Sequence, residues 1–338
     1  MSKFSINHIS SKQGQQGPVL AGITTVNSTG SMRFPSGPTS HRGGRGRGLL
    51  AGGATPTKVN TINYITIATT GNASDFGDLS NTTNGAAAVA SSTRGVFSGG
   101  YTPTVISTID YVIISSSGGA SDFGNLSVAR NDLAGGSNQI RGVYGGGSTG
   151  SYVNIIDYIT IATTGDASEF GDLTSVRRSY MNQGLASPTR AVFGGGNTDP
   201  AIVNTIDFVT IMTTGNAKDF GNLTQARAGV AAGNNTTRGL HISGYTPTMT
   251  NVIDYITIAT LGNSTDFGDV ASVARRGSQA CASSTRCTFG GGTTPTNYNT
   301  IDYVTIASTG NSSDFGDMTA TTKNPAGCSD VHGGLGGG

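Results

Sequence analysis

Short segments in which apolar and polar residues alternate recur along most of this chain, and glycine-rich turns separate them. Residues 299–307, NTIDYVTIA, are typical of these segments, and Asp302 is their one strongly polar position. Both faces of the strand predicted here are therefore mostly apolar, which indicates a strand that is covered on both sides. No window shows the 3.6-residue period of an amphipathic helix, so the pattern predicts an all-β protein.

The alternating segment belongs to a longer unit that recurs six times. The stretch NTIDYVTIASTGNSSDFGDM begins at Asn299, and near copies of it begin at Asn60, Ser107, Asn154, Asn204 and Asn251. The Phe of its DFG or EFG triplet falls at residues 76, 123, 170, 220, 267 and 315, at intervals of 47, 47, 50, 47 and 48 residues. Each unit carries four strand signals, which in the last complete unit are residues 272–283, 284–292, 299–307 and 313–318. Repeats of this length predict the blades of a closed array.

The order of residue types within a unit identifies a family pattern. A basic residue among small residues is followed by a strand that ends in glycines, a strand that contains Tyr, and a last strand with an aromatic residue. In the last complete unit these are Arg275, Gly290–Gly292, Tyr303 and Phe315. The order resembles the kelch repeat over roughly residues 47–330, and it implies a six-bladed kelch-like β-propeller with four short strands per blade. The last aromatic residue is Phe where kelch repeats usually have Trp, and the basic residue is replaced by Thr83 in one unit and by Lys323 in the last.

The two ends of the repeat region complement each other. Residues 45–53 are a second strand without a first, and residues 319–330 are a first strand without a second. We therefore expect one blade to be closed by N- and C-terminal strands, which removes open strand edges. The predicted organisation is an extended N-terminal arm at 1–46, the propeller at 47–331, and a Gly-rich C-terminal tail at 332–338, which we expect on the surface.

Composition and charge add an asymmetry between the arm and the repeats. Glycine accounts for 53 of 338 residues, and charged residues for only 12%. Residues 1–50 contain six Lys or Arg and no acidic residue, which leaves 14 basic residues against all 19 acidic residues in the remainder. A basic leader on an acidic body predicts an arm that docks on another surface, and a merely solubilising arm is the alternative. We predict no membrane association, because no apolar run is long enough to span a bilayer and no secretory signal is present.

Several motifs resemble catalytic or metal-binding motifs but are better explained by a structural role. Six copies of DFG predict a turn, because the other kinase motifs are missing. The Asp of IDY recurs as Asn63 in one unit, which keeps hydrogen bonding without the charge and predicts loop capping rather than acid–base catalysis. A ring of these carboxylates around a calcium ion is the alternative. The five aspartates are Asp110, Asp157, Asp207, Asp254 and Asp302.

The remaining candidate groups also predict no reaction centre. Cys281, Cys287 and Cys328 form no disulfide framework, and the residue types at equivalent positions predict small core residues. None of the four histidines lies at ligand spacing from a cysteine. We therefore predict no catalytic residue, no cofactor and no metal site, and we do not expect an enzyme.

Two complete sets of charged residues recur in the six units. An arginine precedes every second strand, and an acidic residue precedes every last-strand Phe. Because Arg binds carboxylates through two hydrogen bonds, we expect a structural ring of Arg–carboxylate pairs; a basic rim for an anionic ligand is the alternative. The arginines are Arg47, Arg94, Arg141, Arg190, Arg238 and Arg286, and the acids are Asp75, Asp122, Glu169, Asp219, Asp266 and Asp314.

Two further segments have sequences that are typical of binding sites. The segment HRGGRGRG, residues 41–48, is similar to nucleic-acid-binding RGG segments, but its end is already repeat sequence, so nucleic acid is not the expected partner. The loops with GGYTPT, SGYTPT and GGTTPT offer Tyr101, Tyr245 and Pro295 as contacts for a host-surface glycan or protein.

The arm is the part of the chain that occurs only once. Within residues 14–40, GITTV and SMRFP predict a two-stranded hairpin that needs a partner sheet. The block GPVLAGITTVNSTGSMRFPSGPT resembles the N-termini of virion structural proteins of tailed marine phages, particularly those that infect cyanobacteria. The resemblance implies a non-enzymatic virion component, assembled in the host cytoplasm, whose arm binds other virion proteins or copies of itself. A host-binding propeller is the alternative. The residues expected to make the arm interface are Pro18, Val19, Leu20, Ile23, Val26, Met32, Arg33 and Phe34.

Overall fold

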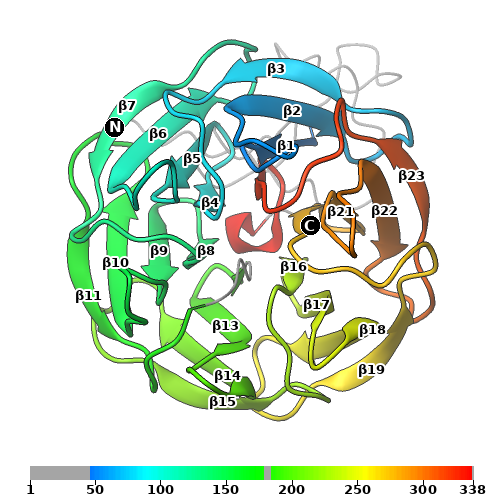
Figure 1. The fold of residues 1–338 in the computed structure, drawn as a ribbon. Helices are drawn as coiled ribbons and strands as arrows, with labels where there is room; N and C mark the ends of the chain where they lie inside the picture. Colours follow the sequence, from blue (N-terminus) through cyan, green and yellow to red (C-terminus); the bar gives the residue numbers. More distant parts are fainter. Residues whose placement is uncertain (1–45, 179–183, 337–338) are drawn as a thin grey trace, which may run out of the picture. The chain divides into compact units, whose positions relative to one another are not determined.

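Six four-stranded antiparallel sheets form a ring in the computed structural model, which describes residues 46–178 and 184–336 (Figure 1). The chain divides into two units, Met1–Arg42 and Gly43–Gly338, and the described residues belong to the second. The predicted hairpin and interface residues of the arm therefore lie outside the described residues. The ring confirms the six-bladed β-propeller with four short strands per blade.

Each blade has four strands, which run in order from the central channel to the rim. Blades 1, 2 and 3 consist of β24 (Ala326–Ser329), β1 (Arg47–Ala51), β2 (Thr61–Thr66), β3 (Ser74–Asp78); β4 (Ala87–Ala90), β5 (Arg94–Ser98), β6 (Thr108–Ile113), β7 (Ser121–Asn125); and β8 (Ala134–Ser137), β9 (Arg141–Gly145), β10 (Ile155–Thr160), β11 (Ser168–Asp172). Blades 4, 5 and 6 consist of β12 (Leu185–Ala186), β13 (Arg190–Asn197), β14 (Ile202–Thr210), β15 (Lys218–Asn222); β16 (Ala231–Asn234), β17 (Arg238–Tyr245), β18 (Met249–Thr257), β19 (Thr265–Asp269); and β20 (Gln279–Ala282), β21 (Arg286–Gly290), β22 (Thr300–Thr305), β23 (Ser313–Asp317).

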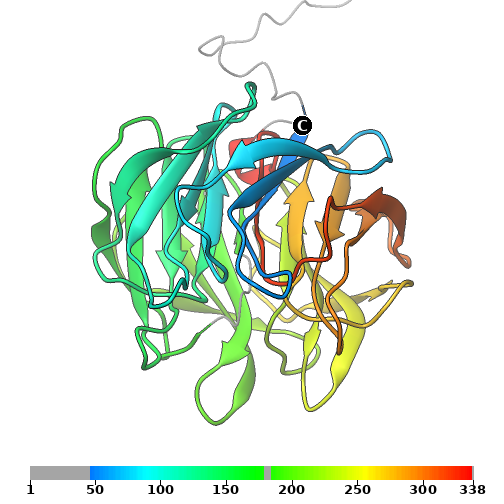
Figure 2. The ribbon, with the colours of Figure 1, turned by 45° about the horizontal axis from the view of Figure 1, so that its top comes forward.

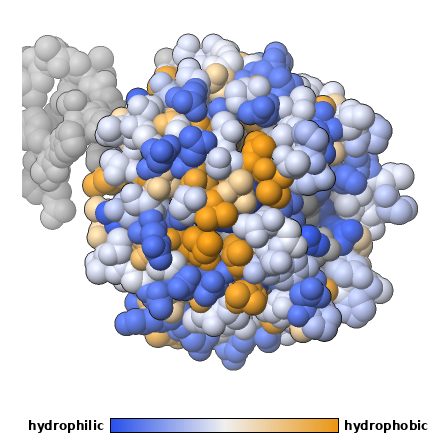
Figure 3. All heavy atoms as spheres, turned by 60° about the vertical axis from the view of Figure 1, so that its left-hand side comes forward, coloured by the Kyte–Doolittle hydropathy of each residue, from blue (hydrophilic) through white to orange (hydrophobic). Residues whose placement is uncertain are grey.

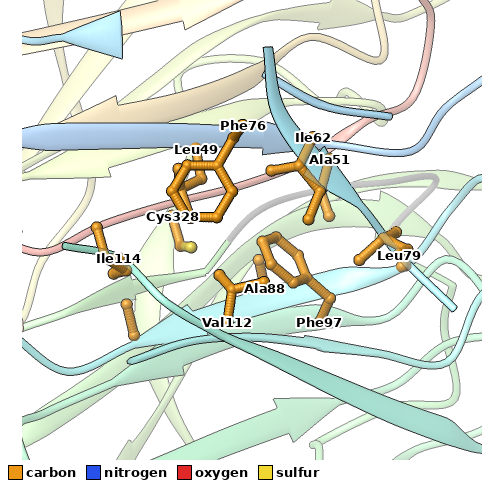
Figure 4. Close-up of a cluster of buried hydrophobic side chains, with 13 residues drawn as sticks. Leu49, Ala51, Ile62, Phe76, Leu79, Ala88, Phe97, Val112, Ile114 and Cys328 are labelled. Atoms are coloured by element: carbon orange, nitrogen blue, oxygen red, sulfur yellow. The ribbon is translucent and has the colours of Figure 1, made fainter. Parts of the chain in front are cut away.

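The distance from the channel decides which residue types each strand carries. The inner strands are buried and most of their residues are small, because neighbouring blades converge there. A Cβ on Gly135 would lie 2.7 Å from the carbonyl oxygen of Ala88 in the neighbouring blade. Third strands are apolar on both faces, as the sequence predicted, because each blade packs between two others. Leu49, Phe76, Phe97 and Val112, for example, belong to one buried cluster between blades 1 and 2 (Figure 4).

The DFG triplets join each blade to the next one. The Phe ring packs edge-on against the aromatic ring of the third strand in all six blades, at centroid distances of 6.0–6.2 Å. The following glycine has a positive φ, +150° at Gly171, and a Cβ there would lie 2.5 Å from the carbonyl of Gly215 in the next blade. Gly215 in turn donates its amide to the Phe170 carbonyl at 2.7 Å. The triplet therefore lies within the outer strand, β11 in blade 3, and not in the turn that the sequence predicted, and its glycine makes a contact with the next blade.

Strands from the two ends of the repeat region close blade 1. The C-terminal β24 pairs antiparallel with β1, so that Leu49 lies opposite Cys328. The amide of Arg47 also donates to the carboxylate of Asp330 at 2.8 Å. The predicted closure of one blade by N- and C-terminal strands is confirmed (Figure 1).

The segment after β24 does not behave as the sequence predicted. Instead of forming a surface tail, Gly333, Gly334 and Leu335 are buried in a 3-10 helix, η2 (Gly333–Leu335), at the mouth of the central channel. The His332 Nε2–H donates to the Ala90 carbonyl at 2.9 Å, and the amide of Gly334 donates to His332 Nδ1 at 3.2 Å. The expectation was wrong because leucine and glycine can fill the narrow space that six converging inner strands leave.

The ring has two faces, which we name by what lies on them. The entry face carries Gly46, where the described chain enters β1, together with η2. The loop face lies at the opposite end of the antiparallel strands and carries the turns between the second and third strand of each blade. The long hairpins β13–β14 and β17–β18 extend on that side, away from the C-terminal end (Figure 2).

Candidate functional site

The predicted ring of arginines exists, but its partners are not the predicted acids. The guanidinium of Arg141 lies 4.1 Å from the centre of the Tyr158 ring, and its Nη1 donates to the Ile211 carbonyl of the next blade at 3.0 Å. All six arginines make this pair of contacts, and their carbonyl partners are in Ile114, Ile161, Ile211, Ile258, Ile306 and Ile67.

The six acids that were expected to pair with this ring are exposed on the outer strands. There, charge on the edge of each blade opposes pairing with strands of other molecules. The expectation of Arg–carboxylate pairing was wrong because the neighbouring blade brings a carbonyl, rather than a carboxylate, to the arginine.

The carboxylate partners belong to another set of arginines, the basic residues that begin a unit in the kelch-like order, such as Arg275, for which no carboxylate partner was predicted. Four buried ion pairs join the loop that enters a blade to the IDY aspartate of the same blade, at N–O distances of 2.7–3.1 Å. The pairs are Arg130–Asp157, Arg177–Asp207, Arg227–Asp254 and Arg275–Asp302. Burial lowers the pKa of the Arg130 guanidinium, and the carboxylate of Asp157 opposes that shift.

A signal for these pairs was present in the sequence. The arginine and the aspartate recur together, 27 or 30 residues apart, in the same four units. In blade 1 the residue beside Asn63 at this position is Thr322, which is buried, and not Lys323, so the assignment of Lys323 was one residue off. Both charges are therefore replaced together in that blade.

The IDY residues also cap the loop that enters their blade. Asp157 accepts hydrogen bonds from the amide of Ser127 at 3.1 Å and from its hydroxyl at 2.6 Å. Asn63 accepts the corresponding pair from Thr319, with 3.1 Å to the amide. The predicted capping is confirmed, and the same carboxylates do not meet in a calcium-binding ring within the described residues.

The central channel is filled by the protein itself. A cavity of about 30 Å³ remains between the small residues of the inner strands and His332, which is room for one or two waters. Cys281 and Cys328 line this cavity and Cys287 lies on β21; all three are free, buried thiols, which confirms them as core residues. Burial raises the pKa of Cys281 to about 12, so its thiol stays protonated and unreactive.

The predicted ligand loops gather on the loop face. Four tips with the sequence Thr-Pro-Thr expose their proline, in blades 5, 6, 1 and 2, which are consecutive around the ring. We call them the TPT arc: Thr246–Thr248, Thr294–Thr296, Thr55–Thr57 and Thr102–Thr104. Tyr101, Tyr245 and Pro295 all lie in or beside the arc, and Tyr101 is 39% exposed.

Basic side chains accompany the arc. Lys58 Nζ lies 4.2 Å from the centre of the Tyr101 ring and donates to the Thr102 carbonyl at 3.1 Å, which ties blades 1 and 2 together. The guanidinium of Arg276 lies 5.0 Å from the Tyr245 ring. An open cleft of about 530 Å³ between blades 1 and 2 is lined by Lys58 and Lys323 together with Thr57, Asn84 and Pro103. The loops of these four blades on this face contain no Asp or Glu.

The rest of the surface offers little that is comparable. Seven large hydrophobic side chains are 39–54% exposed among the described residues. Figure 3 shows one side of the ring, where apolar surface is gathered in the middle of a largely hydrophilic face. Within residues 46–178 and 184–336 no group of three His, Cys, Asp or Glu side chains is placed to hold a metal ion. No helix there is long and apolar enough to cross a membrane.

Comparison with known families and curated proteins gave no match that assigns a role to this site. No model of a known protein family matches the chain. No curated protein matches its sequence either. The resemblance to kelch repeats and to phage virion proteins therefore stays a prediction that rests on the quoted residues.

Proposed function

We propose that this protein is a non-enzymatic structural component of a phage virion, in which the N-terminal arm anchors the propeller to the particle. The observation that carries the proposal is the separation of the two faces. The chain enters the propeller at Gly46 on the entry face, whereas the TPT arc lies at the other end of the strands. A domain held through its entry face would present the arc outward.

The chemistry of the propeller supports a display role over a reaction. Its buried arginines form ion pairs with aspartates, as in Arg227–Asp254. The segment after β24 closes its central channel. The arm's partners would be other virion proteins or copies of the chain, recognised through residues such as Ile23, Val26 and Phe34.

Deleting residues 1–40 from the encoding phage genome tests this proposal. We expect the shortened chain to keep the thermal unfolding of the full chain but to be absent from purified particles, as measured by quantitative mass spectrometry. Incorporation of the shortened chain at the level of the full chain would contradict anchoring by the arm. Absence of the full chain from purified particles would contradict the virion role itself.

A second candidate function, binding of an anionic glycan on the host surface, is favoured by the cleft between blades 1 and 2. Its two lysines and the absence of acidic residues from the surrounding loops attract negative charge, while Pro103 and the nearby Tyr101 supply flat apolar surface for sugar rings. A glycan array with the full chain tests this function. Retention of acidic glycans should fall at least tenfold in Lys58→Ala/Lys323→Ala and stay unchanged in Lys218→Ala, whose lysine lies exposed on β15.

A further inference from the structure

The buried corner between the entering loop and the IDY residue takes three forms in the six blades. Four blades place an arginine opposite an aspartate. Blade 1 places Thr322 opposite Asn63, so that neither residue is charged. Blade 2 places Thr83 opposite Asp110, which removes the cation but keeps the carboxylate. Blade 2 is therefore the one blade in which the two positions do not balance in charge.

The carboxylate of Asp110 is buried in this unbalanced corner. Asp110 is 5% exposed, and its oxygens accept hydrogen bonds from the amide of Ser80 at 2.9 Å and from the hydroxyl of Ser80 at 2.7 Å. No Lys, Arg or His within residues 46–178 and 184–336 forms an ion pair with it. A buried carboxylate without a counter-charge is costly, and proteins normally provide one.

A small cavity lies where the other blades hold their guanidinium. It measures about 10 Å³, which is room for one water or one small ion, and Asp110, Thr83, Asn81 and Phe97 are among the residues that line it. Thr83 is 4% exposed, and its hydroxyl oxygen has no hydrogen-bond partner among the described residues.

One of the residues that line the cavity, Phe97, holds the position at which other blades provide a main-chain acceptor for arginine. The carbonyls of Tyr144, Phe193 and His241 accept Nη2–H bonds from their blade's arginine at 3.1–3.4 Å. Phe97 holds the equivalent position in blade 2. A carboxylate, a hydroxyl and a carbonyl position therefore surround a space of one ion.

We propose that the corner between Thr83 and Asp110 binds a small monovalent cation, such as sodium, potassium or ammonium, which replaces the guanidinium of the other blades. Oxygen atoms are the ligands of such hard cations, and the single carboxylate matches one positive charge. A divalent ion prefers more carboxylates than this corner supplies.

Thermal unfolding of the full chain in different chloride salts at constant ionic strength tests the proposal. Binding to the folded state raises the melting temperature. We expect a rise on the order of 2 °C in sodium, potassium or ammonium relative to tetramethylammonium, which cannot enter the cavity. Equal melting temperatures in all four salts, or a rise in magnesium or calcium only, would overturn the proposal.

Three variants connect the effect to this corner. Asp110→Asn copies Asn63, keeps an oxygen for Ser80, and should abolish the difference between salts. Thr83→Arg copies the four paired blades and should give a cation-independent protein with a higher melting temperature. Asp75→Asn removes an exposed carboxylate from β3 and should keep the full cation effect. Persistence of the effect in Asp110→Asn, or its loss in Asp75→Asn, would show that the ion binds elsewhere.

Discussion

The guanidinium of Arg130 and the carboxylate of Asp157 are fully buried, and their closest N–O distance is 2.9 Å. Moving each charge out of water has a cost, which the opposite charge and the hydrogen bonds of the corner together offset. The stability of the pair therefore depends on keeping both members or replacing both. Blade 1 shows the second solution, with Thr322 and Asn63 at the same two positions.

Asp157→Asn should lower the free energy of unfolding by about 3–5 kcal/mol, because it leaves the Arg130 charge buried without a counter-charge. The double variant Arg130→Thr/Asp157→Asn should recover most of that loss, since it copies blade 1. Urea unfolding measures both. The control is Asp110→Asn, the same change with no arginine opposite; if it is as costly as Asp157→Asn, the loss comes from the cap and not from the ion pair.

His241 shows a different consequence of burial. It occupies the position of Phe97, Phe193 and Phe289 in other blades, and neither ring nitrogen has a hydrogen-bond partner among the described residues. Burial, helped by the nearby charge of Arg227 and opposed by that of Asp254, lowers the pKa of His241 from 6.5 to about 4. The folded state therefore holds the neutral imidazole at pH values where the unfolded chain binds a proton.

Because the unfolded state binds more protons between pH 6.5 and pH 4, the contribution of His241 is complete above pH 6.5 and is lost as the pH falls toward 4. The loss is on the order of 3 kcal/mol at pH 4. His241→Phe should remove this part of the pH dependence, measured by urea unfolding from pH 7.5 to 4.5. His332, whose pKa burial also lowers to about 4, should contribute in the same direction, and Asp132, whose pKa burial raises to about 6, in the opposite direction. An unchanged slope in His241→Phe would contradict the assignment.

At the scale of the element, contact between blades depends on the glycine of each DFG triplet. Gly171 and Gly215 both have φ close to +150°, a backbone conformation that favours glycine equally at the two positions. A Cβ on Gly171 would lie 2.5 Å from the carbonyl of Gly215, whereas a Cβ on Gly215 would meet no atom within 4 Å. Alanine at Gly215 therefore has only the free-energy cost of the backbone conformation, whereas alanine at Gly171 has in addition the cost of the clash with the next blade.

Gly171→Ala should reduce the free energy of unfolding more than Gly215→Ala, by about 1–3 kcal/mol, because only the first methyl group forces β11 away from the next blade. Gly215→Ala measures the shared conformational cost. Chemical denaturation of both variants gives the comparison. Equal losses would mean that the approach of the two blades is not tight enough to require glycine.

At the scale of the whole molecule, closure depends on β24 alone, because it is the strand that joins the C-terminal end to blade 1. Its residues also form one sixth of the channel wall. The segment after β24 adds His332 and η2 on top of an already closed ring. These two parts of the C-terminal region should therefore affect stability very differently.

A chain that ends at Asp330 should still unfold cooperatively, with a modestly lower melting temperature and without the His332 part of the pH dependence. A chain that ends at Pro325 lacks β24, exposes the edge of β1, and should aggregate or lose cooperative unfolding. Size-exclusion chromatography and circular dichroism distinguish the two. Cooperative unfolding of the Pro325 form would show that β24 is dispensable for closure.

The sequence by itself determined the periodic part of this protein. The six Phe positions gave the blade number, the doubly apolar strands indicated packing between neighbours, and the incomplete units at residues 45–53 and 319–330 predicted the closure. These features are predictable because strand period and turn residues determine structure within a few residues of the chain, and because the same unit recurs six times.

Only the tertiary structure decided which groups meet. Arg141 contacts the Tyr158 ring of its own blade and the Ile211 carbonyl, 70 residues away. The buried carboxylates pair instead with Arg130 and its equivalents. The C-terminal glycines fill the channel mouth because the space there admits no side chain: a Cβ on Gly334 would overlap the carbonyl oxygen of Ser137. The repeat showed that Arg130 and Asp157 occur in the same units, but not that they pair. Which charged groups pair is decided by the distances and the burial that the closed ring imposes, because the free energy of a charge pair depends on its separation and on its exposure to water.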